Sequence, residues 1–180
     1  MYKRAIIASA VMATLVSPFA HADTATDLTQ TQRELIKANC ISVKTTLSRI
    51  HANDALSRVH LGQEYETLST KLMAPMNSRV ALNKLNGVEL AKTTVEFNES
   101  VDEFRDAYKV YEQTLSRALQ IKCAEEPQQF YDAIVAAQLQ RAEVRTHVES
   151  LAQLVTQYKQ QVGKLRAQAL TTQQDKEQGV

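Results

Sequence analysis

Glycine and proline are scarce in this chain and tryptophan is absent: its 180 residues include four glycines and three prolines. An all-β sandwich needs a turn about every 8–12 residues, and such turns usually carry glycine, proline or asparagine. A phosphate-binding loop needs glycines at short spacing. The composition therefore argues against an all-β fold and against a glycine-rich nucleotide site.

Motifs that carry catalytic chemistry are missing as well. There is no GxSxG, and no serine has a lysine three residues later, so the common acyl-enzyme patterns are absent. Neither HExxH nor ExxH occurs, which argues against zinc hydrolases and di-iron bundles, and no CxxCH offers a haem attachment site. We therefore predict a protein that is not an enzyme and that holds no metal or cofactor.

Two pairs of side chains come closest to a site. His51 and Asp54 share a helix face at i, i+3, and Glu143 and His147 share one at i, i+4. Two ligands do not hold a metal ion, so we expect surface residues or local hydrogen bonds there. A cavity ringed by His51, Asp54 and His60 would instead favour an enzyme or a small-ligand carrier.

The first 22 residues have the organisation of a signal peptide. A short basic start precedes an apolar stretch over residues 5–20, and Ala20 and Ala22 form the small-x-small pattern that signal peptidase cleaves. The alternative is an uncleaved anchor helix, but the apolar stretch is shorter than the ~20 residues that span a bilayer. We predict cleavage after Ala22 and export to the periplasm, the cell surface or the medium, with membrane attachment only through an uncleaved signal.

The charge of the exported chain is close to neutral. Cleavage would remove two of the 21 basic residues and leave 19 against 20 acidic ones. A nucleic-acid binder usually shows a basic excess clustered on one face, whereas the basic residues here are scattered. We predict no nucleic-acid partner.

Export would place the two cysteines, Cys40 and Cys123, in an oxidising compartment. An even number of cysteines in an oxidising compartment indicates a disulfide, and two cysteines allow a single pairing. Their separation in sequence rules out a CxxC redox motif. The alternative is a pair of buried free thiols.

The second half of the chain has the apolar 4-3 spacing of helices packed lengthwise against others. This spacing predicts helices over 88–121 and 127–170. Gly87 marks the end of the preceding helix, since glycine there adopts the left-handed conformation readily, and Pro127 suits a first helical turn. The two apolar seams are Phe97, Val101, Phe104, Tyr108, Tyr111, Leu115, Ala118 and Phe130, Ile134, Ala137, Arg141, Val144, Val148, Leu151, Val155, Tyr158, Val162, Leu165.

The first half permits two architectures. A helix is expected to begin near Asp27 or Thr29, and either it continues to residue 85 with a kink at Gly62 or Pro75, or the chain reverses near Gly62. The first alternative gives three helices and the second four. The first half of the chain carries two apolar stripes. They are Ile36, Cys40, Val43, Leu47, Ile50 and Leu61, Tyr65, Leu68, Leu72, Met76.

The cysteines discriminate between these architectures. In a four-helix packing Cys40 and Cys123 lie at opposite ends of the bundle. In a three-helix packing Cys123 lies level with about residue 50. Along the bundle it is then about ten residues, or ~15 Å, away from Cys40, and the loop or a kink must close this distance. We therefore predict an all-α, slim antiparallel bundle or coiled coil of three long helices, with residues 23–172 as a single domain and 173–180 as a disordered tail.

Residues 65–87 stand out because they have few acids and a Leu-Met-Ala-Pro-Met core. Met73, Pro75, Met76 and Arg79 form a candidate interaction surface, because thioethers adapt easily to a partner. The alternative is that the methionines fill gaps around a proline kink.

The stretch from Asn39-Cys40 through HANDALSRVHLGQEYETLSTKLMAPMNSRVALNKLNG resembles a family of short exported helical proteins of unknown function from candidate-phyla bacteria, the Saccharibacteria in particular. The resemblance extends through Cys123 and FYDAIVAAQ. It implies a bacterial exported protein with a two-cysteine framework, and it implies no activity.

These observations predict a non-enzymatic exported module that contacts a protein or a cell-envelope component. The alternative is a periplasmic holdase-type chaperone, although the near-neutral charge does not favour one. Long seams with exposed flanks also favour self-association, so a homo-oligomer is a further expectation.

Overall fold

The structure, a computed structural model, describes residues 27–178, with side chains up to residue 171, and within this range it is helical and contains no strand. The predicted signal peptide, with Ala20 and Ala22, lies outside the described residues. The helices are α1 (Gln30–Thr67), the π-helix η1 (Leu68–Met73), α2 (Ala74–Leu82), α3 (Val88–Gln120) and α4 (Pro127–Gln178).

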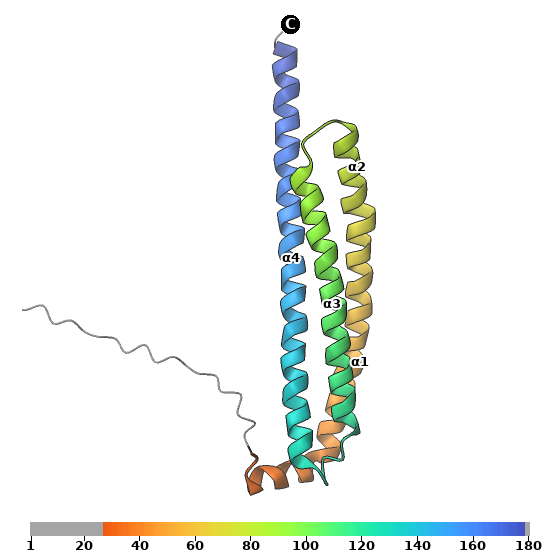
Figure 1. Ribbon diagram of the computed structural model, residues 1–180, viewed down its shortest axis with the longest axis vertical. Coiled ribbons are helices and arrows are strands. Elements are labelled where there is room, and N and C mark those ends of the chain that lie inside the picture. The colour runs from red at the N-terminus through yellow and green to blue at the C-terminus, as the bar shows by residue number, and fades with distance from the viewer. Residues whose placement is uncertain (1–26, 179–180) are drawn as a thin grey trace, which may run out of the picture.

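The segments α1, η1 and α2 follow one another without a break and form one long rod beside α3 and α4 (Figure 1). The chain continues through Gly62 as a regular α-helix. The prediction of an all-α fold with three long helices is therefore confirmed, and the four-helix alternative is wrong.

The helix starts agree with the sequence. Thr29 precedes α1, its hydroxyl accepts a hydrogen bond from the Gln32 backbone N–H at 3.3 Å, and its own N–H donates to the Gln32 side chain at 2.8 Å. This reciprocal capping satisfies two of the N–H groups that a helix start leaves unpaired. Pro127 is the first residue of α4, where its missing N–H removes no helical bond.

The turn between α2 and α3 differs from the expectation. The left-handed residue is Lys84, with φ of 56°, whereas Gly87 has φ of −106°. The backbone N–H groups of Lys84 and Leu85 bond the carbonyls of Ala81 and Val80, which is a Schellman ending. Gly87 is needed for a different reason: a Cβ there would lie 2.6 Å from Cγ1 of Val80.

The π-helix η1 changes which face of the first rod is buried. Pro75 has no N–H to donate to the Lys71 carbonyl, and just before it the Ala74 N–H bonds the Ser69 carbonyl, five residues back. The wider turn places Met73 in the core, at 2% exposure, and leaves Leu72 57% exposed. The expected position of Leu72 on the apolar face is therefore wrong, and the irregularity lies next to Pro75 rather than at Gly62.

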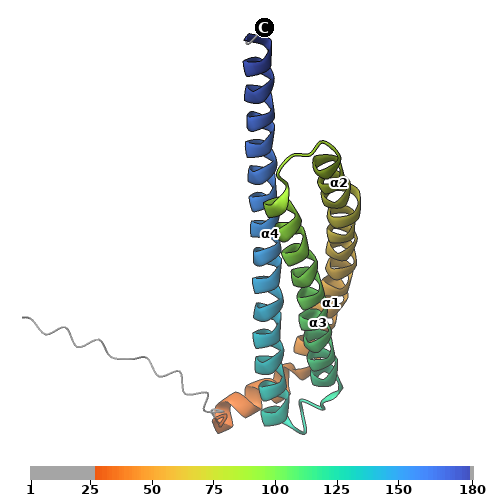
Figure 2. The ribbon, with the colours of Figure 1, turned by 45° about the horizontal axis from the view of Figure 1, so that its top comes forward.

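The last helix is longer than the predicted 127–170. It continues to Gln178, over most of the segment for which a disordered tail was expected. No glycine or proline lies between Gly163 and Gly179 to interrupt it, and the glutamines and charged residues there are good helix formers. As a result α4 extends beyond the turn that joins α2 to α3 (Figures 1 and 2).

The core is divided along the long axis of the bundle. We call the end with the α2–α3 turn the upper half and the end with the disulfide the lower half. All seven predicted core residues of α3 are buried. In the upper half they share a core with both other rods, through the buried residues Tyr65, Met73, Val80, Leu90, Phe97, Val101, Phe104, Leu151, Tyr158 and Leu165.

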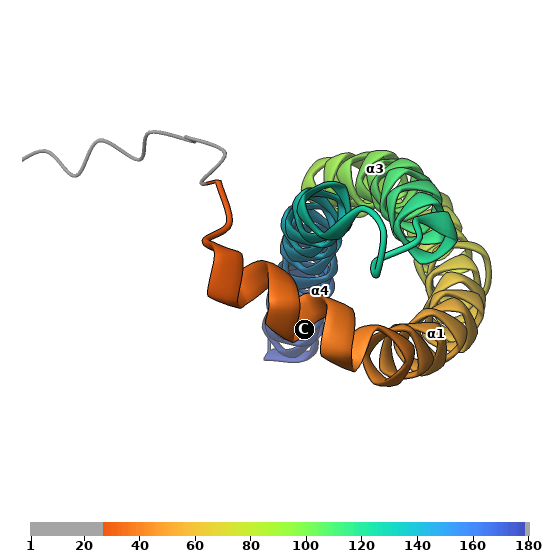
Figure 3. The ribbon, with the colours of Figure 1, turned by 90° about the horizontal axis from the view of Figure 1, so that it is seen from below.

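In the lower half the buried cluster comes from α3 and α4 alone. It consists of Tyr108, Tyr111, Leu115 and Ala137, and from α1 it receives only the partly buried Leu47. Figure 3, seen from below, shows α3 between the other two rods, with α1 and α4 on either side. α4 packs along α3, whereas α1 touches α4 at few points.

A disulfide between Cys40 and Cys123 closes the lower end, with their Cα atoms 5.6 Å apart. The predicted pairing is confirmed and the free-thiol alternative is wrong. The first turns of α1 run crosswise past the lower end of α4 (Figure 3), and the Leu28 N–H donates to Oε1 of Gln128 at 2.8 Å. Lys44 donates a hydrogen bond to the Ile121 carbonyl at 3.1 Å. The first turns of α1 bend toward α4, and this bend closes most of the distance that was expected to separate the two cysteines.

Candidate functional site

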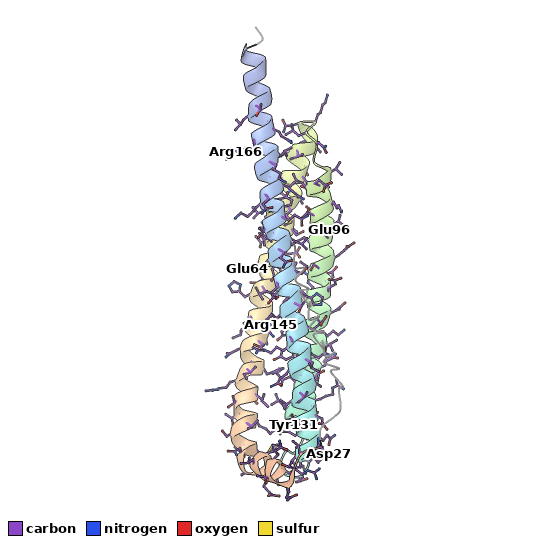
Figure 4. The ribbon with its side chains drawn as sticks, turned by 90° about the vertical axis from the view of Figure 1, so that its left-hand side faces the viewer. Asp27, Glu64, Glu96, Tyr131, Arg145 and Arg166 are labelled. Atoms are coloured by element: carbon purple, nitrogen blue, oxygen red, sulfur yellow. A yellow bond between two sulfur atoms is a disulfide. The ribbon has the colours of Figure 1, made fainter. Side chains whose placement is uncertain are left out.

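A groove of about 480 Å³ lies between α1 and α4 in the middle of the bundle, with α3 as its floor. Its volume falls within the range of small-molecule sites, about 300–1,000 Å³. Figure 4 faces the side on which α1 and α4 lie next to each other, with Arg145 labelled on α4. The residues that line the groove are Asp54, Ser57, Arg58, Leu61, Phe104, Tyr108, Tyr111, Gln138, Arg141, Ala142, Val144, Arg145 and Val148.

The lower end of the groove is closed by a bridge from α1 to α4. Nε and Nη2 of Arg141 donate to the two carboxylate oxygens of Asp54 at 2.8 and 2.9 Å. The Tyr111 hydroxyl of α3 donates to the same carboxylate at 2.6 Å. Bidentate arginine–carboxylate pairs fix geometry as well as charge, so three helices meet at one point. This bridge explains why Arg141 interrupts the apolar seam of α4.

The bridge controls the ionisation of its members. Partial burial alone would raise the pKa of Asp54, but the hydrogen bonds from Arg141 and Tyr111 and the charge of Arg141 outweigh it and lower the pKa below 3.8. The pKa of Tyr111 is raised by burial and by the neighbouring Asp54 carboxylate. Asp54 is therefore ionised and Tyr111 protonated at neutral pH.

The polarity of the groove changes along its length. Since α1 and α4 ascend and α3 descends, residues after Asp54 and Arg141 lie above the bridge, as do residues before Tyr111. The lining near the bridge and at the level of Val144 is polar, and the lining one turn higher is apolar. The apolar upper part consists of Leu61, Phe104 and Val148.

The middle of the groove carries two arginines without acidic partners. The Arg58 guanidinium lies over the Tyr108 ring, with Cζ 5.1 Å from the ring centroid, which is a cation–π contact. Arg145 has neither a hydrogen bond nor an ion pair to any residue of the described chain. Among the described residues that line the groove, Asp54 is the one acid. Because Arg141 already neutralises it, the groove carries an excess of positive charge.

The Tyr108 hydroxyl is the unusual polar group of this site. Tyr108 is 3% exposed and lines the groove, yet its hydroxyl has no hydrogen-bond partner within the described part of the protein. Burial raises the pKa of Tyr108, helped by the charges of Glu112 and Asp54, so the hydroxyl stays protonated. Buried polar groups are normally paired, so this hydroxyl is an unsatisfied donor in the wall of the groove.

The histidines do not join the groove. His51 lies 3.3 Å from the Ser116 hydroxyl, and His60 pairs with Glu64 on the outside of α1. The ring of His51, Asp54 and His60 that would favour an enzyme is therefore not formed.

The second pair, Glu143 and His147, does form within α4, and Glu103 of α3 joins it. His147 lies 3.5 Å from Glu143 and 3.6 Å from Glu103. Within residues 27–178 no group of three histidine, cysteine or acidic side chains is placed to hold a metal ion. The pair is a link between two helices rather than a set of ligands.

The four residues of the candidate interaction surface point in different directions. Met73 is buried and Met76 packs against the same core, while Pro75 and Arg79 are exposed. The methionines thus occupy the position expected for gap fillers beside the irregular turn. Arg79 and Pro75 remain on the outer face of the first rod.

Sequence reasoning missed Arg58, Tyr108 and Arg145 as site residues. The sequence pattern predicts Tyr108 as an ordinary seam residue and the two arginines as solvated surface residues. The one available signal was Arg141, a charge inside an apolar seam, which calls for an acidic partner on a facing helix. Finding Asp54 as that partner requires the register of α1 against α4.

Comparison with protein families, with curated proteins and with solved structures found no match for this chain. Within the described residues, no helix combines the length and the apolar character that a membrane span requires.

Proposed function

We propose that this protein is an exported, non-enzymatic helical-bundle module that binds a cell-envelope component or a protein in the groove between α1 and α4. The observation that carries the proposal is the pair of exposed arginines without acidic partners, Arg58 and Arg145, beside the buried, unpaired Tyr108 hydroxyl. Charged and polar groups without partners in a concave site are typical of ligand recognition.

Export and bacterial origin belong to the same proposal. A structural disulfide persists in oxidising compartments, and the bridge between Cys40 and Cys123 agrees with the signal-peptide pattern before residue 23. The resemblance to exported helical proteins of candidate-phyla bacteria supports the same setting. We also propose coiled-coil packing between α3 and α4, because their seams keep the 4-3 spacing over most of their length.

Binding is favoured over catalysis by the state of the polar groups. The Asp54 carboxylate is held by Arg141 and Tyr111, and its low pKa makes it a weak base. The groove therefore offers positive charge and apolar surface rather than a general base or an activated nucleophile.

The test uses the exported full chain with its disulfide intact. It is incubated with an envelope extract, and bound material is identified by native mass spectrometry as a stoichiometric adduct. We expect the adduct to be lost in the double variant R58A/R145A and kept in R49A/R166A, which removes one exposed arginine from each of α1 and α4 outside the groove. An adduct that both double variants lose equally, or none at all, would contradict the proposal.

The second candidate function is a holdase-type chaperone, favoured by the exposed apolar tip. Leu82 is 82% exposed and Val88 68% exposed at the α2–α3 turn, beside the part of α4 that extends beyond it. A holdase should suppress aggregation of an unfolded client in a light-scattering assay, and L82S/V88S should weaken it. If L82S/V88S suppresses aggregation as well as the unsubstituted chain, the tip does not bind the client.

A further inference from the structure

We infer that the groove binds a single-chain anionic lipid, with its head group at Arg58 and Arg145 and its chain in the apolar upper part. This inference rests on the proposed function and names the ligand class for the same groove. It follows from three features of the groove: its charge, its polarity gradient and its short length.

The charge selects an anion. Arg58 and Arg145 have no acidic partners, and the single acid of the described lining is already bound by Arg141. The Tyr108 ring holds the Arg58 guanidinium over the groove, and the Tyr108 hydroxyl has a hydrogen to donate. Carboxylate and phosphate oxygens accept from guanidinium groups in the same fork geometry. The head group is therefore a carboxylate or a phosphate.

The apolar upper part selects a hydrocarbon chain. Leu61, Phe104 and Val148 line it, and no charged side chain of the described residues lies among them in this part of the groove. A simple inorganic anion would leave this surface exposed to water, whereas an acyl chain would cover it. The combination of a cationic middle and an apolar upper part therefore fits an amphiphile.

The length of the groove limits the occupant to one short element. The bridge between Asp54 and Arg141 lies toward its lower end, and its lining reaches up to Leu61 of α1 and Val148 of α4. From Asp54 to Leu61 a helix rises about 10 Å, so the groove extends over only about two helical turns. The groove volume likewise suits one chain rather than a diacyl lipid or a partner helix.

The test measures binding of dodecanoate and of lysophosphatidic acid to the disulfide-bonded full chain by titration calorimetry, below the concentration at which either forms micelles. Dodecanol is the neutral control of equal chain length. We expect saturable one-to-one binding of at least one anionic lipid and at least tenfold weaker binding of dodecanol. Binding of carboxylate alone or phosphate alone identifies the head group, and either result supports the inference.

The variants locate the site. R58A/R145A should weaken binding at least tenfold and Y108F by about three- to tenfold, because a hydrogen bond contributes roughly that factor, while R49A/R166A should leave it unchanged. Shortening the chain should weaken binding by about fourfold per methylene that leaves the groove. Thermal unfolding of each variant, with a midpoint near that of the unsubstituted chain, shows that the fold is intact.

The failures of the two proposals can be told apart. If an envelope adduct depends on Arg58 and Arg145 but neither anionic lipid binds, the lipid inference is overturned and the binding function stands. If the lipids bind equally well to R58A/R145A, or dodecanol binds as tightly as dodecanoate, the groove is not the anion site and the inference is likewise overturned. If no adduct forms and no lipid binds, both proposals fail.

Discussion

The two halves of the bundle are held together by different physical means. In the upper half all three rods contribute buried side chains to one core, for example Met73, Phe97 and Leu151. In the lower half α1 has no buried side chain below Tyr65, and it is held by the disulfide and by polar contacts at discrete points. Apolar burial joins all three rods in the upper half, whereas discrete contacts hold α1 in the lower half, and the groove lies where the two halves meet.

The upper half also contains polar contacts that set its register. The Tyr158 hydroxyl bonds the Asn77 side chain at 2.9 Å, and Asn77 donates to Thr94 at 2.8 Å, so all three rods are connected. Gln157 and Gln161 both donate to the buried Thr93 hydroxyl. A purely apolar seam can slide by one repeat, whereas these bonds form in one register only.

Removing the disulfide should have the largest effect on this comparison. The double variant C40S/C123S should lose about 4 kcal/mol of unfolding free energy, because the bond closes a long loop of the unfolded chain. Urea denaturation measures the loss. Hydrogen exchange should show faster exchange for α1 below Tyr65 and little change in the upper half of α3.

Equal exchange increases in both halves would contradict the division between them. The single variants C40S and C123S serve as the control, since each breaks the same bond and should unfold at nearly the same urea concentration as the double variant.

The second prediction compares one leucine from each half. Leu151→Ala should cost about 3 kcal/mol, because this side chain is fully buried among all three rods. Leu47→Ala should cost about 1 kcal/mol, because Leu47 is only partly buried in the lower half. Urea denaturation of both variants tests the difference, and equal costs would show that the lower half is packed as tightly as the upper.

The third prediction concerns the bridge at the lower end of the groove. Asp54→Asn should cost about 1–2 kcal/mol at pH 7, a value reduced by the partial exposure of the pair. The pKa of Asp54 is lowered in the folded state, so its contribution is present above the unfolded pKa and is lost as pH falls through the folded one.

The unsubstituted chain and D54N should therefore differ in stability at pH 7 and converge in strong acid. Asp106→Asn, at an exposed acid outside the groove, is the matched control and should leave the unfolding free energy unchanged both at pH 7 and in strong acid. A D54N deficit that persists unchanged below pH 2 would show that it does not arise from the ionised carboxylate.

The smallest expected effect lies at the turn of the upper half. Lys84 has φ of 56°, a conformation in which glycine carries no steric penalty, so Lys84→Gly should stabilise the protein by up to about 1 kcal/mol. Lys84→Ala keeps the Cβ and should not. Thermal unfolding of the two variants distinguishes them, and a gain with alanine would show that charge rather than backbone conformation matters there.

The predictions from sequence succeeded where one helix face is buried along its whole length. The seam of α3 keeps its spacing from Phe97 to Ala118, so its buried face and its ends could be predicted. They failed where the helix itself is irregular, since the wide turn at η1 moves the buried face from Leu72 to Met73. In the candidate site only Arg141 gave a signal, because Arg58 and Arg145 resemble any solvated arginine until their neighbours are known.

The sequence by itself determined the helical class and the starts and most of the ends of the three rods, because caps, breakers and periodicity act over a few neighbouring residues. It also allowed a single disulfide, because the chain has two cysteines. Only the tertiary structure decided the register of α1 and, through it, the Asp54–Arg141 bridge and the groove. Register depends on the sum of the η1 turn, the bend in α1 and the contacts between helices. Of these, the η1 turn alone has a local cause, the missing N–H of Pro75, and a shift of one residue would separate the charges that meet at the bridge.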